Sequence, residues 1–417
     1  MEFELQPVTE PGRQMVELAE EHATDFASRA EEHDRDGTFA FENVKAMRES
    51  GFAAAAVPKE FGGMGVTSIH DSVVAVSRLG RADASTPLAF TMHLFRTLNM
   101  VRGLRIANAA GDKARQTRYK DMLSKIGAGE LIIAVANSER GANIRTSRTL
   151  ATKVEGGWLF NGTKTFATGS PAADALAVRA RYENDSGEIR LGAAIVPVAR
   201  PGLEIMNNWD GLGMKASGSH DVVFTDYFVS DEEFDDIGEF GKFNASALAG
   251  VSGSSLGLAS VFLGIAESAH DIAVTAIRDR DAARDPMNQA TAAENEIDLA
   301  AMRGILGRAA QVLDDNLQTA EGFDGVGAPP VLSGMEAFQL IKNAACAKKF
   351  VMDQSCVIVD RALTLYGGGG FLNNSPLARL YRDVRAGPFM QPWARHQAID
   401  LIGKVALGLD PNEELSD

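Results

Sequence analysis

The hydrophobic pattern of this chain changes twice along its length, and few folds satisfy both changes. Up to about residue 130, and again beyond about residue 240, apolar residues recur every three or four positions, as on one face of a helix. In between, short segments rich in Val, Ile, Phe and Thr are separated by Gly, Asn, Asp and Ser, which is typical of an antiparallel β-domain of about six to eight short strands. The pattern predicts a mainly α-helical protein with a central β-domain.

The order of these blocks predicts three domains. The last block is long enough for a four-helix bundle, with a loop at 322–330 between two helical stretches. Within the middle block, Asn161-Gly162 predicts a hairpin turn, because both central residues of a type I′ turn need a positive φ. We expect an N-terminal helical domain at 1–130, a middle β-domain at 131–240 and a C-terminal helical bundle at 241–417.

Composition argues against several classes of partner. The 417 residues include 41 Lys and Arg against 56 Asp and Glu, a net charge of −15, whereas nucleic acids and anionic membranes both select a basic face. We therefore expect neither as a main partner. The first residues, MEFELQPVTEPG, lack the apolar stretch of a signal peptide, and we identify no apolar run near the roughly 18 residues of a membrane span. These features predict a cytoplasmic protein.

The two cysteines, Cys346 and Cys356, lie in one helical stretch and lack the spacing of a zinc site or a disulfide framework. We expect reduced, mostly buried thiols and no bound metal. An anionic ligand would then need other donors. The run Gly367, Gly368, Gly369, Gly370 would expose several N–H groups to a pyrophosphate, although the same run is also typical of a flexible loop between helices.

Several short motifs, each weak alone, occur together in a specific order and spacing. The motifs are Pro58-x-Glu60-Phe61-Gly62-Gly63, Gly129-Glu130, Phe160-Asn161-Gly162-x-Lys164-x-Phe166-x-Thr168, Gly211-Leu212-Gly213-Met214-Lys215-Ala216-Ser217, Leu365-Tyr366-Gly367-Gly368-Gly369-Gly370-Phe371 and Arg379-x-Tyr381-Arg382-Asp383. On these motifs the chain resembles the acyl-CoA dehydrogenase superfamily of flavoproteins over nearly its whole length.

The resemblance implies an N-terminal helical domain, an antiparallel β-barrel or sandwich and a C-terminal four-helix bundle. It also implies a flavin, FAD or FMN, between the β-domain and the bundle, completed by a second subunit of a homotetramer. By resemblance, Phe166 packs against the isoalloxazine, Thr168 lies near its N5 atom, and Ser138 and Ser217 face the flavin. Arg280 matches an arginine that reaches the flavin pyrophosphate of a neighbouring subunit, where a planar guanidinium suits phosphate oxygens.

The sequence departs from the family at the catalytic base. An acyl-CoA dehydrogenase needs a carboxylate to remove the α-proton of its substrate. Gln391 occupies that position here, and an amide does not accept a proton near neutral pH. The position that some members use instead, on the first helix of the bundle, matches Ser254. Asp383 remains a candidate replacement base, although the family uses it as a structural ion-pair partner.

With both base positions empty, we favour a resemblance to the flavin-dependent monooxygenases built on this fold, such as dibenzothiophene monooxygenase and enzymes that N-hydroxylate amino sugars. They use O₂ and reduced flavin, and a separate flavin reductase often supplies the reduced flavin. They need a dry pocket instead of an α-base. In this interpretation His93 would hold or deliver a proton near the flavin, although a hydrogen-bonded core histidine fits equally. Met92, Phe389 and Trp393 would line an apolar pocket for a small organic substrate.

Three alternatives remain open from the sequence. The chain could be an acyl-CoA dehydrogenase or oxidase with an unrecognised base, or a base-less subunit of a heteromeric dehydrogenase. It could also be a non-catalytic flavin-binding homologue. The retained flavin-facing residue types Phe166, Thr168 and Ser217 argue against that last class.

Overall fold

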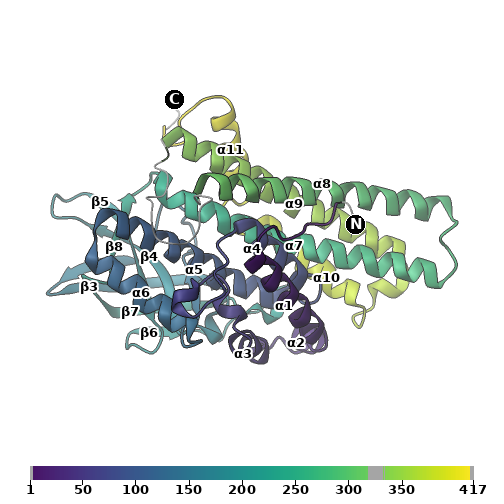
Figure 1. Ribbon diagram of the computed structural model, residues 1–417, viewed down its shortest axis with the longest axis horizontal. Helices are drawn as coiled ribbons and strands as arrows, with labels where there is room; N and C mark the ends of the chain where they lie inside the picture. The colour runs from purple at the N-terminus through teal and green to yellow at the C-terminus, as the bar shows by residue number, and fades with distance from the viewer. Residues whose placement is uncertain (1–2, 318–331, 333, 414–417) are drawn as a thin grey trace.

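The computed structural model describes residues 3–317, 332 and 334–413. Helices occupy both ends of the chain and strands its middle, in the order that the hydrophobic pattern predicts (Figure 1). Side-chain caps start several helices: Thr9, Ser68 and Asp112 each accept a main-chain N–H of the first turn. The N-terminal part comprises α1 (Glu10–Ala27), α2 (Ala30–Asp36), α3 (Phe41–Glu49), α4 (Ile69–Gly80), α5 (Ser85–Ala110) and α6 (Lys113–Gly127), with short 3₁₀ turns at η1 (Phe52–Ala54) and η2 (Lys59–Phe61).

The middle part forms one eight-stranded sheet with the order β6-β7-β3-β2-β4-β5-β8, and β1 pairs with β4. Most neighbours are antiparallel, as expected, but β1–β4 and the short β2–β4 contact are parallel. The β2–β3 hairpin reverses the chain once, and the connection from β3 to β4 reverses it again. Strand β4 therefore runs in the same direction as β2 and β1. No described residues pair β6 with β8, so the sheet is open and not a closed barrel. The strands are β1 (Ile133–Ala136), β2 (Leu150–Val154), β3 (Gly157–Ala167), β4 (Ala175–Glu183), β5 (Ile189–Pro197), β6 (Leu203–Ile205), β7 (His220–Ser230) and β8 (Asp235–Glu239).

The predicted hairpin turn at Asn161-Gly162 is wrong. Both residues lie inside β3, and the turn that precedes this strand contains Gly156, whose φ is 75°. Asn161 instead exchanges two hydrogen bonds of 2.9 Å with Asp226 on β7, at a bulge in the β3–β7 ladder. Gly162 is needed there because a Cβ would lie 2.6 Å from Thr149 Oγ1. The Asn-Gly pair thus marks a β-bulge and a close approach of two chain segments.

The C-terminal part has three long helices, and two short helices replace the expected fourth. Pro388 and Pro392 interrupt the last helical stretch, because proline has no main-chain N–H to donate, so the stretch cannot continue as one helix. Of the two pieces, α10 packs on α7 and α9, and α11 packs on α9. The helices are α7 (Ala245–Asp279), α8 (Pro286–Leu317), α9 (Gly334–Tyr366), α10 (Pro376–Val384) and α11 (Arg395–Ala406). The expected loop at 322–330 lies outside the described residues.

Helix α7 joins the two helical parts. It contacts α4 and α5 on one side and α8 and α9 on the other, and buried side chains line it from Leu256 to Ala273. In the described part of the chain it is long and apolar enough to cross a membrane, over Ser252–Asp279, which the sequence analysis did not anticipate. Of its most apolar window, 61% is buried inside the protein. This is the environment of a core helix.

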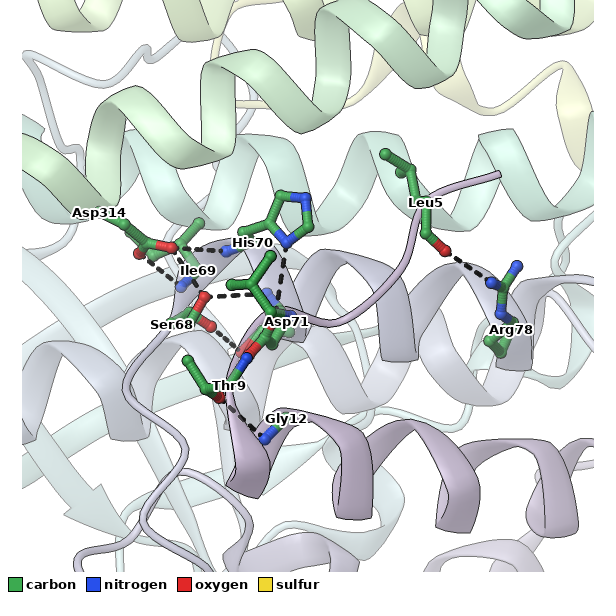
Figure 2. A network of polar contacts seen from close by, with 11 residues as sticks. Leu5, Thr9, Gly12, Ser68, Ile69, His70, Asp71, Arg78 and Asp314 are labelled. Atoms are coloured by element: carbon green, nitrogen blue, oxygen red, sulfur yellow. Dashed lines mark hydrogen bonds and ion pairs between the residues drawn. The ribbon is translucent and has the colours of Figure 1, made fainter. Parts of the chain in front are cut away.

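A carboxylate network fastens the N-terminal segment and α8 to the start of α4 (Figure 2). Asp71 accepts the N–H of Val8 at 2.8 Å and the hydroxyl of Thr9 at 2.5 Å. From the other side, Asp314 accepts the Ser68 hydroxyl at 2.7 Å and two main-chain N–H groups of the first turn of α4. Three segments far apart in the sequence therefore meet at one helix terminus.

Candidate flavin and substrate site

At the end of β3, three hydroxyl groups form a chain that leads from the surface into the β-domain. The Thr168 hydroxyl lies 2.9 Å from that of Ser219, which lies 2.7 Å from the hydroxyl of Ser217. Ser217 is fully buried, and it ends the short turn η4 (Lys215–Ser217). Thr168 and Ser217, which the resemblance implies lie at the flavin, come together in the structure. Ser219 was not predicted, although its spacing from Ser217 by two positions was a usable signal.

Phe166 stands beside this chain in an unusual conformation. Its φ is 55°, and 62% of its surface is exposed. A large aromatic residue in the left-handed region is an outlier that commonly marks a functional position. The ring of Trp209 meets it edge-on with centroids 6.0 Å apart, and Trp209 is itself fixed by its Nε1–H bond to the Met214 carbonyl. An open aromatic face flanked by hydroxyls fits the planar ring of a flavin. No motif in the sequence pointed to Trp209.

Ser138 lies next to the same strand, because its carbonyl accepts the Thr165 N–H at 2.8 Å. The altered motif that begins at Ser138 continues with Glu139, which is buried and binds Lys164 at 2.7 Å. Burial opposes its ionisation, but Lys164 and Thr149 outweigh burial and hold the pKa of Glu139 below its ordinary value. This ion pair fixes the segment that presents Ser138. Ser138, Phe166, Thr168 and Ser217 thus form one group on the β-domain.

Arg280 and the glycine run form a second group. The Arg280 guanidinium donates to the Tyr366 carbonyl at 2.6 Å and lies 4.9 Å from the centroid of the Tyr366 ring. Gly367, Gly368 and Gly369 follow and are exposed; Gly367 has a φ of 85°, and the turn η5 (Gly368–Phe371) begins here. Arg280 directly follows α7, whose C-terminal end lies at the end of the molecule away from the strands (Figure 1). The expectation that Arg280 serves a neighbouring subunit stays a prediction.

The loop at the base position is held by a buried lysine. Lys348 of α9 donates to the carbonyls of Met390 and Pro392, on either side of Gln391. Burial lowers the pKa of Lys348 to about 7. The Gln391 side chain is exposed, and Trp393 has a φ of 65° with only 4% of its surface exposed.

The remaining pocket candidates differ in exposure. Trp393 packs in a core cluster beside Phe243, with ring centroids 5.5 Å apart. Phe389, at the end of the turn η6 (Gly387–Phe389), is 73% exposed. Met92 is half-buried against the main core. Their assignment to a substrate pocket stays a prediction.

Neither alternative base is placed as a free carboxylate. Ser254 lies half-buried on α7. Asp383 is buried and accepts the Met214 N–H at 2.6 Å. Burial raises the pKa of Asp383 to about 6, although Arg379 acts in the opposite direction. Since a Cβ on Gly213 would lie 2.4 Å from the Arg382 backbone, Asp383 ties the Gly211–Ser217 motif closely to α10. This is a structural task.

His93 is buried with both ring nitrogens engaged. Nε2 lies 2.9 Å from the Ala53 carbonyl, and Nδ1 lies 3.1 Å from the Ile133 N–H. Only one tautomer satisfies both contacts, with the proton on Nε2 and a lone pair on Nδ1. Burial lowers the pKa of His93 to about 4. The geometry matches a hydrogen-bonded core histidine, the alternative that the sequence left open, and offers no free nitrogen for proton delivery.

Two further expectations concern metals and thiols. Among the described residues, no group of three or more His, Cys, Asp and Glu side chains could hold a metal ion. Cys346 and Cys356 are free and half-buried. Burial raises the pKa of both thiols, so neither is a reactive thiolate at neutral pH.

Known proteins resemble this chain in sequence and fold over nearly its whole length. The models of the N-terminal, middle and C-terminal domains of acyl-CoA dehydrogenase match residues 9–119, 133–227 and 256–391. The amino sugar nitrososynthase DnmZ of Streptomyces peucetius is 34% identical over 97% of this chain and 95% of its own length. The L-evernosamine nitrososynthase of a Micromonospora strain is 33% identical over 98% of this chain and 93% of its own length.

Solved structures agree. KijD3, in complex with FMN and dTDP-3-amino-2,3,6-trideoxy-4-keto-3-methyl-D-glucose, has a TM-score of 0.87 and 33% identity, and covers 99% of this chain and 97% of its own. The FMN-bound TdsC of Paenibacillus sp. A11-2 has a TM-score of 0.80 at 22% identity, covering 95% of this chain and 97% of its own, which supports the fold alone. The chain therefore belongs to the acyl-CoA dehydrogenase family, in its flavin-dependent, monooxygenase-like branch.

Proposed function

We propose that this protein oxidises the amino group of a nucleotide-linked amino sugar, with reduced flavin and O₂ as co-substrates. The observation that carries the proposal is the 33–34% identity, over nearly the whole chain, to relatives named for forming nitroso groups on amino sugars. KijD3, similar to the same degree, was solved with a dTDP-linked amino sugar. A nucleotide-linked substrate would require a site for its phosphates and sugar next to the flavin.

The base position supports oxygenation over α,β-dehydrogenation. A dehydrogenase must remove a carbon-bound proton with a carboxylate. Gln391 has an amide, and the buried Asp383 already accepts the Met214 N–H. An amine nitrogen carries its own lone pair, so its oxidation requires no such base. The same argument disfavours an acyl thioester as substrate.

The proposed reaction balances without further reagents. In the first round, one amine, one O₂ and one reduced flavin give a hydroxylamine, one water and one oxidised flavin. In a second round, the hydroxylamine, another O₂ and another reduced flavin give a nitroso group, two waters and one oxidised flavin. When bound, the reduced flavin supplies the two electrons of each round. Phe166 and Trp209 would hold its ring plane, and the Thr168 hydroxyl, oriented by Ser219 and Ser217 behind it, would bind its polar edge.

We also propose FMN as the flavin, because KijD3 and TdsC were solved with FMN. Since the reaction consumes reduced flavin, a separate reductase would regenerate it from a nicotinamide cofactor. A homotetramer and a cytoplasmic location remain expectations from the sequence.

The test is a reaction with chemically reduced FMN, O₂ and a dTDP-linked amino sugar, followed by mass spectrometry. We expect the amino sugar to gain one oxygen atom as the hydroxylamine, or one oxygen atom with the loss of two hydrogen atoms as the nitroso product. We expect no product from the matching sugar that carries a hydroxyl in place of the amine. An anaerobic panel of acyl-CoA thioesters serves as the counter-test. Bleaching of bound oxidised flavin at an enzymatic rate by any thioester would overturn the proposal. Protein that binds no flavin in either redox state would favour a non-catalytic homologue.

Gln391→Glu separates the two chemistries further. We expect this variant to gain no acyl-CoA dehydrogenase activity, because Lys348 holds the carbonyls on either side of residue 391 and the side chain at that position is exposed. The same anaerobic assay, run on the variant beside the parent protein, checks this.

A further inference from the structure

Polar residues form a row on the sheet face that packs against α5 and α6. In the β4–β5 ladder Arg179 lies opposite Ala193, and in the β5–β8 ladder Ala193 lies opposite Asp235. Asn137 comes one position after the last β1–β4 pair, which places it beside Arg179. Side chains at one level of neighbouring strands share a face. The small Ala193 leaves space in the middle of this row.

The row begins where the apolar contact with α5 ends. Two residues further back along these strands, Ala177 and Ile195 pack with Val101 and Leu104 of α5 in one apolar cluster. Arg179 replaces this apolar surface with a guanidinium, and Arg181 adds a second one on the same face.

Arg96 projects from α5 toward the same place. Burial, and then the nearby charge of Arg96, lower the pKa of Arg179 to about 10. The Nε atoms of Arg96 and Arg181 and the Oδ1 atom of Asn137 are buried, and none of them has a hydrogen-bond partner among residues 3–317, 332 and 334–413. Two half-buried cations therefore lie near each other, with unused donors and an unused acceptor around them.

The nearest carboxylates are already engaged. Glu139 is held by Lys164 at 2.7 Å. Asp235 binds Arg115 at 3.1 Å and Arg118 at 2.5 Å. Buried charged groups are stable when they are paired, and an unpaired group in a native structure calls for a ligand or an ion. An anion would neutralise the excess charge.

We propose that Arg96 and Arg179, with Arg181 and Asn137 beside them, bind the phosphate groups of the substrate; the assignment rests on the proposed function. Guanidinium groups bind phosphate oxygens through paired N–H donors. The site also lies next to the flavin group. Asn137 directly precedes Ser138, whose carbonyl binds Thr165 beside Phe166. A phosphate held here would position the attached sugar toward the exposed ring of Phe166.

The experiment is isothermal titration of the FMN-loaded protein with dTDP, thymidine and inorganic pyrophosphate. We compare the parent with Arg96→Gln and Arg179→Gln, and with Arg35→Gln, which removes an exposed charge that pairs with its neighbour Asp36. We expect at least a tenfold loss of dTDP affinity in the two site variants, and no change in Arg35→Gln. Thymidine, which lacks phosphate, should bind all four proteins equally weakly.

Arg96→Gln also carries a stability readout. The Nε atom of Arg96 has no hydrogen-bond partner among the described residues. A role in folding alone therefore predicts a lower melting temperature for this variant, whereas a ligand site predicts an equal or higher one. This arm keeps the proposal testable even where Arg179→Gln, which loses a 2.8 Å bond to the Ile144 carbonyl, folds poorly.

The outcomes are distinct. Parent protein that binds dTDP with site variants that bind it equally well would overturn the anion site and leave the proposed function standing. Parent protein that binds pyrophosphate but not dTDP, with the binding lost in Arg96→Gln, would support the anion site and contradict a nucleotide-linked substrate. A parent that binds neither overturns the anion site.

Discussion

At the scale of single residues, His93 of α5, which bonds to Ile133 of β1 and to Ala53, has either a catalytic or a structural role. Both of its nitrogens are engaged, and burial lowers its pKa to about 4 from an ordinary 6.5. We expect His93→Gln to keep turnover per folded molecule within about threefold and to lose roughly 2 kcal/mol of unfolding free energy, the range of buried hydrogen bonds. A pH–rate profile and urea unfolding of both proteins provide the measurement.

The sign of the pH effect follows from the direction of the shift. The unfolded chain binds the His93 proton below about pH 6.5, whereas the native state binds it only near pH 4. Stability from neutral His93 is therefore complete above pH 6.5 and decreases as the pH falls toward 4. A variant that stays folded but loses all turnover would restore the catalytic interpretation.

Asp383 shows the opposite shift. Its pKa rises from 3.8 to about 6 through burial, so the native state holds the proton that the unfolded chain releases between these values. Wild-type stability should fall across this range as pH rises. Asp383→Asn keeps an oxygen for the Met214 N–H and removes the ionisation. We expect it to match the parent near pH 4 and to exceed it by up to about 3 kcal/mol at pH 8.

Chemical denaturation at both pH values measures this difference, with Asp383→Ala as the matched control. The alanine variant lacks the acceptor for Met214 and should be less stable at either pH. An asparagine variant less stable than the parent at pH 8 would contradict the assignment of Asp383 as a structural acceptor.

At the scale of elements, the carboxylate network of Figure 2 holds the N-terminal segment against α4; we call this network of Asp71 and Asp314 the strap. Burial disfavours the Asp71 carboxylate, but bonds from His70, Thr9 and Val8 outweigh burial and lower its pKa. Stability from Asp71 is thus present above the ordinary value of 3.8 and lost only as the pH falls through the lower, native value. Asp71→Ala should cost roughly 3 kcal/mol at pH 7 and speed hydrogen exchange of the Val8 and Thr9 amides.

Gly12→Ala provides a second disruption of the same strap, because its Cβ would lie 1.9 Å from Asp71 Oδ2. Asp36→Asn, on an exposed carboxylate, is the control and should change neither quantity. Unchanged exchange of the Val8 and Thr9 amides in both strap variants would show that the network does not hold the segment.

The elements also show what the sequence could and could not predict. Helix and strand periodicity reflects burial, which local spacing encodes, so the helical, β and helical order is confirmed. Asn161-Gly162 was misassigned because a bulge and a turn demand the same backbone freedom, and only the partner strand distinguishes them. Phe166 and Thr168 lie two positions apart, and the Thr168 N–H donates to the Phe166 carbonyl, while their place at a flavin stays a prediction. Arg96 and Arg179 meet through strand register and helix docking, which no local motif records.

At the scale of the whole molecule, the two groups of predicted cofactor residues belong to different parts of the fold. Ser138, Phe166 and Thr168 lie on the β-domain, whereas Arg280 lies past the end of α7, away from the strands (Figure 1). One flavin can use both groups only if a second copy supplies Arg280. The Arg280 guanidinium already rests on Tyr366, beside the exposed Gly367 and its neighbours. It is therefore pre-positioned on a surface where a partner's ligand could meet it.

This arrangement predicts complementation between two defective copies. Arg280→Gln should weaken FAD about tenfold, because FAD extends to a pyrophosphate, while changing FMN affinity little. Phe166→Ala should weaken both flavins by removing the ring platform. In a co-expressed mixture that pairs at random, half of the dimers contain one copy of each variant. Each such dimer has one intact site of two, so about a quarter of all sites should recover parental FAD affinity. Fluorescence titration of the mixture measures that fraction, and its absence, with mixed oligomers present, would mean that Arg280 serves the flavin of no other copy.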